Sequence, residues 1–181
     1  MAAGDGLVSM KPTSIAHSGT SASINADGGV DFTAVTELNL NGVFTGDYDN
    51  YLIVMSHIGS ANENIPLRLR VSGVDASGSD YTRQALAAIS TSVLGQRDTS
   101  QSAIVVGRVS ASRGGEQIHV YGPSLAQPTA FRNVNVNGVS GAAIEADNAG
   151  THSLSTAYDG FSFVLAADNM TGNVHVFGYE E

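Results

Sequence analysis

The stretch "VDFTAVTELNL", residues 30–40, decides the fold class of this chain. Its apolar residues recur at close to every second position: Val30, Phe32, Val35, Leu38 and Leu40. A period of two is that of a β-strand that buries one face. The alternation slips by one residue between Phe32 and Val35, and such a slip predicts a β-bulge inside the strand.

Similar strand patterns recur along the rest of the chain. In "PLRLRVSG", Leu67, Leu69 and Val71 fall on one face and the arginines between them on the other. The apolar run "YLIVMSHI", residues 51–58, predicts a strand buried on both faces. Further strands are expected at 81–90 (where Ala and Leu also allow a short helix), 102–111, 116–123, 131–141, 160–167 and 172–179.

Turn residues suggest how some of these strands connect. The sequence "SRGG" is expected to join 102–111 to 116–123 as a pair, and "DNMTG" to join 160–167 to 172–179 as a hairpin. Within 131–141 the apolar positions are Phe131, Val134 and Val136, the last two separated by Asn135.

About eight to ten strands without a convincing helical period predict an all-β protein. Because open sheet edges must be covered, an antiparallel β-sandwich with a jelly-roll-like arrangement fits best. The length of 181 residues suits one domain. We expect a polar N-terminal arm or extended segment at 1–29, with a short strand at 20–25, followed by a single sandwich domain at 30–181.

Composition excludes several classes of function. The net charge is −9, and Lys11 is the single lysine, so no basic cluster exists to bind nucleic acid or an anionic membrane surface. The absence of cysteine excludes disulfides, zinc–thiolate sites and thiol nucleophiles. No apolar run is long enough to cross a bilayer, and the N-terminal residues do not resemble a secretory signal. We therefore expect synthesis in a cytoplasm and no membrane insertion.

Two short segments nearly repeat each other: "IHVYG", residues 118–122, and "VHVFG", residues 174–178. Alternation places the aliphatic residues on the core face and His119 and His175 on the other face. If the two strands lay side by side, these histidines could contribute to a metal site, for which they are the weak candidates. No third ligand has a suitable spacing, so contact with a neighbouring subunit is the favoured interpretation and no metal is expected.

Other motifs favour structural interpretations over chemistry. Asp47 and Asp49 in "GDYDN" resemble half of a calcium loop, but the pattern lacks the remaining ligands, and Gly, Asp and Asn before a strand are typical of a turn. The chain has no nucleophile elbow, nucleotide loop or metalloprotease motif. We expect no catalytic residues, no cofactor and no enzymatic activity, and the sequence assigns no interaction residues.

Several segments together carry a family resemblance: "GDYDNYLIVM", "SGSDYTRQ", "VYGPSLAQPT", "STAYDGFSF" and the final "VHVFGY". From about Lys11 to Tyr179, the chain resembles small virion structural proteins of tailed bacteriophages, especially cyanophage-type proteins described as tail-fibre or appendage-like. The resemblance implies a non-enzymatic particle component with a β-sandwich, assembled as a homotrimer or another symmetric multimer.

The expected function is therefore a tail-fibre or other appendage protein that contributes to assembly and host attachment. Its expected partners are further copies of itself, other virion proteins and a host-surface glycan, and its expected location is the virion, released by lysis. One alternative is a capsid decoration (cement) protein of the same fold. A second alternative, from another class, is a free carbohydrate-binding or hydrolytic β-sandwich.

Overall fold

The structure is a computed structural model that describes residues 6–139 and 142–179. Over these residues the chain forms fourteen antiparallel strands and no helix, in a curled sheet with the layers of a jelly-roll-like β-sandwich. The all-β prediction is confirmed. Because no helix occurs in this part of the chain, it contains none that could cross a membrane. The strands are β1 (Val8–Ser9), β2 (Ser14–Ile24), β3 (Val30–Asn41), β4 (Asn50–Gly59), β5 (Glu63–Val71), β6 (Val74–Asp75), β7 (Tyr81–Ile89), β8 (Ser92–Gln101), β9 (Ile104–Val109), β10 (Gly114–Tyr121), β11 (Thr129–Val139), β12 (Ala142–His152), β13 (Gly160–Val164) and β14 (Met170–Tyr179).

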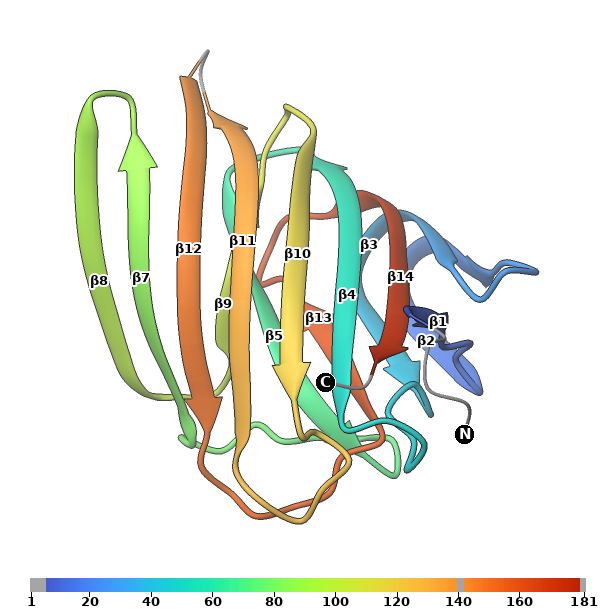
Figure 1. Ribbon diagram of the computed structural model, residues 1–181. Helices are drawn as coiled ribbons and strands as arrows, with labels where there is room; N and C mark the ends of the chain where they lie inside the picture. Colours follow the sequence, from blue (N-terminus) through green and yellow to red (C-terminus); the bar gives the residue numbers. More distant parts are fainter. Residues whose placement is uncertain (1–5, 140–141, 180–181) are drawn as a thin grey trace.

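The sheet folds over into two layers (Figure 1). The front layer has the strand order β8-β7-β12-β11-β10-β4-β14. The back layer contains β6-β5-β13-β3, with β9 paired to β5 and β2 paired to β3. Strand β14 pairs with both β4 and β3 and so joins the layers. The apolar core fills the space between them, and the face of the front layer that points away from the back layer is called the outer face below.

Strand β3 contains the predicted bulge. All five apolar residues of the opening stretch are buried, and Ala34 between them has a positive φ of 47°. The pairing of β3 shifts register opposite Gly19 on one side and opposite Met170 on the other. The slip in the sequence therefore marks the position where an extra residue keeps both halves of the strand facing the core.

The two echoed segments lie on β10 and β14, which flank the central strand β4 on either side. Ile118, Val120, Val174 and Val176 are at most 1% exposed, as the alternation predicts. Both strands run antiparallel to β4 and pack their aliphatic residues against the same core. This shared position accounts for the near-repeat of the sequence.

Both predicted strand pairings across a turn are wrong. Strand β9 pairs with β5 and not with β10, and β3 lies between β13 and β14. In each case the connection leads from the back layer to the front layer. Turn residues fix where the chain reverses, but the packing of the two layers decides which strand becomes the neighbour.

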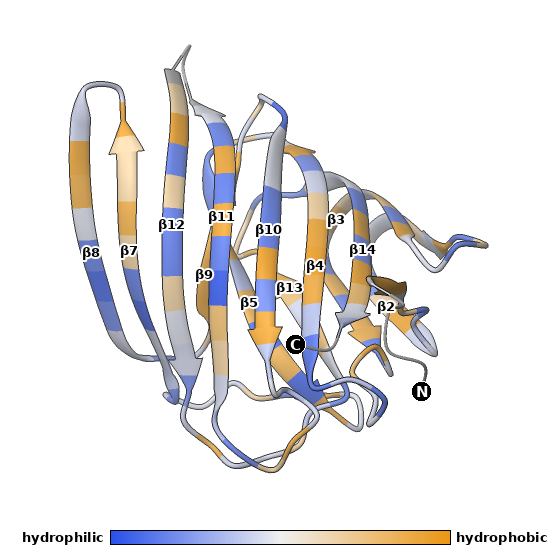
Figure 2. Cartoon of the chain, in the orientation of Figure 1, coloured by the Kyte–Doolittle hydropathy of each residue, from blue (hydrophilic) through white to orange (hydrophobic). Residues whose placement is uncertain are grey.

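Strand β4 is buried on one face only. Tyr51 and Ile53 have no exposed surface, whereas Leu52 and Val54 on the outer face are half-buried. The prediction of burial on both faces is therefore wrong for the monomer, because this apolar outer face is not covered by another layer of the described chain. Figure 2 shows apolar bands on β4, β10 and β14, which include the core residues of these strands.

The polar strands were the hardest to foresee. Strands β8 and β12 have few apolar residues, and neither was expected. Within the segment expected as an N-terminal arm, β2 extends from Ser14 to Ile24 and pairs with β3, so it is longer than the expected strand at 20–25. These strands are stabilised by backbone pairing along an apolar neighbour, which leaves little periodicity in their own side chains.

Candidate functional site

The two histidines proposed as weak metal candidates lie on the outer face, separated by β4. His119 is paired with Leu52 and His175 with Val54, so the two positions are two strands apart and offset along β4. Strand spacing alone places them roughly 9 Å or more apart. Over the described residues, no group of three His, Cys, Asp or Glu side chains could hold a metal ion.

Each histidine packs against an aromatic neighbour. His119 stacks on Tyr121, and its Nδ1 lies 2.9 Å from the hydroxyl of Tyr179. His175 stacks on Phe177 in the same way. The histidines are thus part of an aromatic surface on the outer face and are not brought together into one centre.

The "GDYDN" segment forms a turn before β4. The Thr45 hydroxyl donates to the Asp47 carboxylate at 3.1 Å, and the carbonyl of Asp49 accepts from the backbone N–H of Gly122 at 2.8 Å. These contacts are the local turn chemistry expected of Asp before a strand.

In strand β11 the polar side chains face the interior and the apolar ones face outward, the reverse of the usual arrangement. Asn133, Asn135 and Asn137 point into the sandwich and are at most 5% exposed, while Val134 and Val136 point outward and are 42% and 53% exposed. The interior asparagines face the back layer at β9, where the carbonyl of Val106 accepts hydrogen bonds from the amides of Asn133 and Asn135. Side-chain amides thereby satisfy a backbone group at the bulged part of β9.

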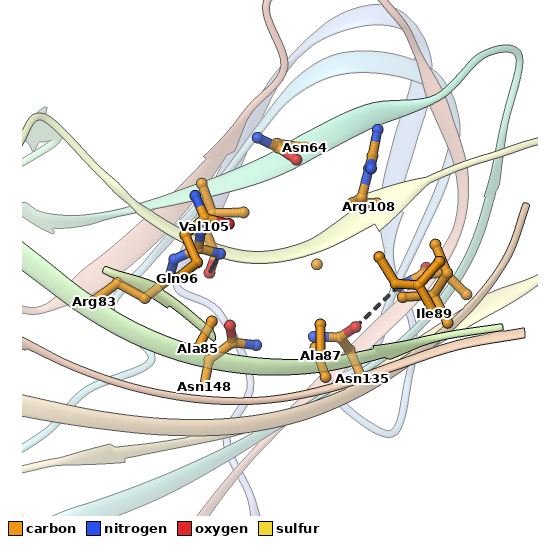
Figure 3. Close-up of a pocket in the computed structure, with 14 residues that line it drawn as sticks. Asn64, Arg83, Ala85, Ala87, Ile89, Gln96, Val105, Arg108, Asn135 and Asn148 are labelled. Carbon is orange, nitrogen blue, oxygen red and sulfur yellow. Dashed lines mark hydrogen bonds between the residues drawn. The ribbon is translucent and has the colours of Figure 1, made fainter. Parts of the chain in front are cut away.

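Asn135 and Asn137 form part of one side of an interlayer cleft, a cavity of about 130 Å³ between β9 and the strands β7, β11 and β12 (Figure 3). Small side chains on the front layer, those of Ala85, Ala87 and Ala146, line the cleft and leave space there. Figure 3 shows Asn64 and Arg108 turning away from this space, so the inner wall consists of alanines, isoleucines and amides.

The charge of Arg83, one of two arginines that line the cleft, is compensated internally. The Arg83 guanidinium reaches the Asp98 carboxylate at 2.7 Å, and Gln96 donates to the same carboxylate at 3.0 Å. In contrast, the Asn148 side chain is 3% exposed and points into the cleft, and none of the described residues forms a hydrogen bond with its amide. Asn148 therefore turns its amide toward a cleft that Arg83 and Arg108 also line.

A buried ionisable pair adjoins the cleft. Nε2 of His57 lies 3.0 Å from Oε1 of Glu116, and both side chains are completely buried. Glu116 rests against Gly107 of β9, where a Cβ atom would overlap the carboxyl group. His57 Nδ1, Glu116 Oε2 and Asn137 Oδ1 make no hydrogen bond within the described chain.

The His57–Glu116 pair is uncharged. Burial raises the pKa of Glu116 to about 10 and lowers the pKa of His57 to about 4, with the nearby Arg113 lowering it further. At neutral pH the carboxyl group therefore keeps its proton and the imidazole is neutral. Because both side chains are completely buried, the pair does not contact solvent.

The outer face of the front layer carries several exposed valine and leucine side chains. The strand registers place Val54, Val134 and Leu86 in one row across β4, β11 and β7, and Val136 and Val93 in the next row. Leu86 is 58% and Val93 69% exposed. Gly115 leaves a hollow between these rows. Gln117, Asp147 and Glu145 lie between these apolar residues in the same rows. The outer face is therefore mixed, with exposed apolar side chains that are open to contact.

The sequence contains patterns that relate to both the interlayer cleft and the outer face. The alternation "NVNVN" (133–137) has the amides and valines in strict period two, which defines two faces without saying which is inside. Small residues at 85, 87 and 146 indicate where the space between the layers is not filled, but this becomes visible only once β7 and β12 are known to be neighbours.

Comparison with protein-family models and with curated proteins finds no match for this chain.

Proposed function

We propose that this chain is a non-enzymatic structural protein of a tailed-phage particle, a component of a tail fibre or another appendage that contributes to assembly and host attachment. The observation that supports the proposal best is the group of exposed apolar side chains on the outer face of the front layer, Leu86, Val93, Val134 and Val136. Exposed contiguous apolar patches on soluble proteins mark interaction surfaces. A capsid decoration protein would use the same face and remains the alternative.

A second copy of the chain is the occupant we assign to the outer face. Beside the valines and leucines, this face carries both signs of charge, with Arg132 and Arg97 near Asp147 and Glu145. Another copy can therefore offer complementary charges to this face. Symmetric self-association is also the usual form of protein assembly.

Val136→Lys is expected to weaken this self-association. Val136 lies in the outer-face rows and is 53% exposed, so the charge should leave folding nearly unchanged while disfavouring burial in an interface. Light scattering after gel filtration should give a multimer for the unmodified chain and a smaller species for the variant. Val74→Lys is the control, since Val74 is 67% exposed on β6, in the back layer. An unmodified chain that is monomeric at high concentration contradicts the assignment.

Locating the chain in the phage particle tests the proposal that it is a tail or appendage protein. An image of the assembled phage with this chain labelled should place it on the tail or an appendage, in few copies. Many copies over the capsid surface would support the decoration alternative instead. Absence of the chain from purified particles, measured by mass spectrometry, would exclude both.

A further inference from the structure

We propose that the free edge of β8 pairs with β8 of a second copy, antiparallel and across a two-fold axis, so that the front layers of two copies become one continuous sheet. This edge contact is separate from the outer-face contact, because it is made by the backbone at the border of the sheet and not by the side chains of its face. It goes beyond the proposed function and does not depend on where the chain lies in a particle.

Strand β8 is the last strand of the front layer. It pairs with β7, and Figure 1 shows no other strand of the described residues beside its opposite edge. In an antiparallel sheet the outermost strand leaves the backbone N–H and C=O groups of every second residue unpaired. These groups are the donors and acceptors that a strand from another chain can bind.

Exposed apolar side chains lie on both faces of this edge strand. Val93, on the outer face, is 69% exposed, and Leu94, on the opposite face, is 51% exposed. Proteins commonly protect an edge strand with proline, lysine or a bulge. Strand β8 contains neither proline nor lysine, and it pairs with β7 without a shift from Ser92 to Asp98. The edge is therefore regular, partly apolar and open to pairing.

The other long edge strand is less suited to pairing. Among the described strands β2 pairs only with β3, and this pairing shifts register between Ser18 and Gly19. The isoleucines of β2, Ile15 and Ile24, are half-buried. Because a bulge bends a strand and interrupts its ladder, we assign the edge contact to β8.

A second copy of β8 is the occupant because the strand complements itself. A two-fold axis perpendicular to the sheet keeps the outer faces of both copies on one side, so opposed residues must face the same way. When the axis passes beside Gly95, the whole regular segment 92–98 pairs with its copy, and Val93 lies opposite the aliphatic stem of Arg97. Axes beside Arg97 or Asp98 would instead oppose like charges, which destabilises a strand pair.

The neighbouring positions of the axis use less of the strand. An axis beside Leu94 would extend the pairing into the turn at 90–91. An axis beside Gln96 would set Val93 opposite Thr99, where the pairing of β8 with β7 is shifted. The register centred on Gly95 therefore uses all of the regular segment without opposing like charges.

Single cysteines in the full chain test the pairing and its register, because the natural sequence contains no cysteine. In the edge contact the two copies of residue 95 face each other with Cα atoms about 4.5–5.5 Å apart, which is within the span of a disulfide. A Cβ atom at Gly95 meets no other atom within 4 Å, so the fold accepts the substitution. Residue 93 lies opposite residue 97 of the other copy, which puts the two copies of residue 93 roughly 14 Å apart.

We therefore expect Gly95→Cys to form a disulfide-linked dimer at least tenfold faster than Val93→Cys under the same mild oxidation. Electrophoresis without reductant gives the rate, and mass spectrometry of the linked peptide identifies the bond. Val93→Cys is the matched control, because residue 93 is on the same strand and the same face and is well exposed.

A charge on the inner side of β8 separates the edge contact from the outer-face contact. In the Val136→Lys background, where the outer-face contact is weakened, analytical ultracentrifugation should show a dimer that dissociates on dilution. Adding Leu94→Lys should leave only monomer, because the two new charges would lie about 7–8 Å apart across the axis. Leu154→Lys in the same background is the control and should keep the dimer, since Leu154 is 44% exposed in the loop between β12 and β13. Thermal unfolding of each variant checks that the fold is retained.

Several outcomes would overturn the edge contact. They are a Val136→Lys chain that stays monomeric at high concentration, a dimer that Leu94→Lys does not weaken, and equal rates of linking for the two cysteine variants. A dimer that Leu94→Lys dissociates but Gly95→Cys does not link would mean that β8 binds a different strand, such as β2, and would also overturn it. All these measurements use the isolated chain, so failure to find the chain in a virion would contradict the proposed function alone.

Discussion

Gly172→Ala is expected to prevent stable folding. Gly172 lies on β14 where this strand pairs with both β3 and β4, and a Cβ atom there would overlap the carbonyl oxygen of Ser56. The obstructing atoms belong to the backbone of a paired strand, so the clash can be relieved only by separating the strands. We expect a loss of more than about 3 kcal/mol, beyond the usual range for a single substitution.

Urea unfolding and the yield of soluble protein measure this effect. Gly95→Ala on β8 is the matched control, because a Cβ atom at Gly95 meets no other atom within 4 Å. The control should be as stable as the unmodified chain, or more stable by about 0.5 kcal/mol, since alanine restricts the unfolded strand. Equal stability of the two variants would show that β14 does not pack against Ser56 as described.

Glu116→Gln is expected to stabilise the protein at neutral and alkaline pH. The pKa of Glu116 is raised from 4.5 to about 10, so the folded state must keep a proton that the unfolded chain releases above its ordinary pKa. The stability contribution of this group is therefore complete below pH 4.5 and is lost as pH rises toward 10. Each pH unit above 4.5 lowers the free energy of unfolding by about 1.4 kcal/mol, so the loss at pH 7 is roughly 3 kcal/mol.

His57 acts in the opposite direction. Its pKa is lowered from 6.5 to about 4, so its contribution is complete above pH 6.5 and is lost as pH falls toward 4. The free energy of unfolding should be measured by chemical denaturation from pH 4 to 9. In both the unmodified chain and Glu116→Gln it should fall toward pH 4, whereas the fall toward pH 9 should occur only in the unmodified chain. Glu145→Gln, at an exposed position on β12, is the control and should keep the decline. If the unfolding free energies of the unmodified chain and of Glu116→Gln changed in parallel above pH 6.5, the buried pair would be ionised.

Much of the architecture follows from the sequence, because alternation of apolar residues is local information. The bulge in β3 and the buried faces of β10 and β14 were predicted from residues a few positions apart. Pairing is not local: whether β9 joins β5 or β10 depends on how two layers stack, which a turn sequence does not encode. The polar strands β8 and β12 escaped prediction for a related reason, since backbone pairing alone leaves no pattern.

The cleft and the outer face were less predictable than the core. Asn133, Asn135 and Asn137 would ordinarily be placed on the solvent side of a strand, because asparagine is rarely buried. Their inward orientation depends on the bulged carbonyl of Val106, which accepts two of their amides from the opposite layer. Such a partner is found only when both strands are placed in three dimensions.

The position of β14 between β3 and β4 has a consequence for biosynthesis. A ribosome that has released β3 through β13 has exposed two long apolar strands whose shared neighbour, Met170–Tyr179, is still to be made. The nascent chain can form the β2–β3 and β10–β11 pairs early, but the two layers cannot be joined until this strand emerges. We infer that the chain completes its fold late in translation, and that its apolar strands β3 and β4 are open to aggregation until β14 has been made.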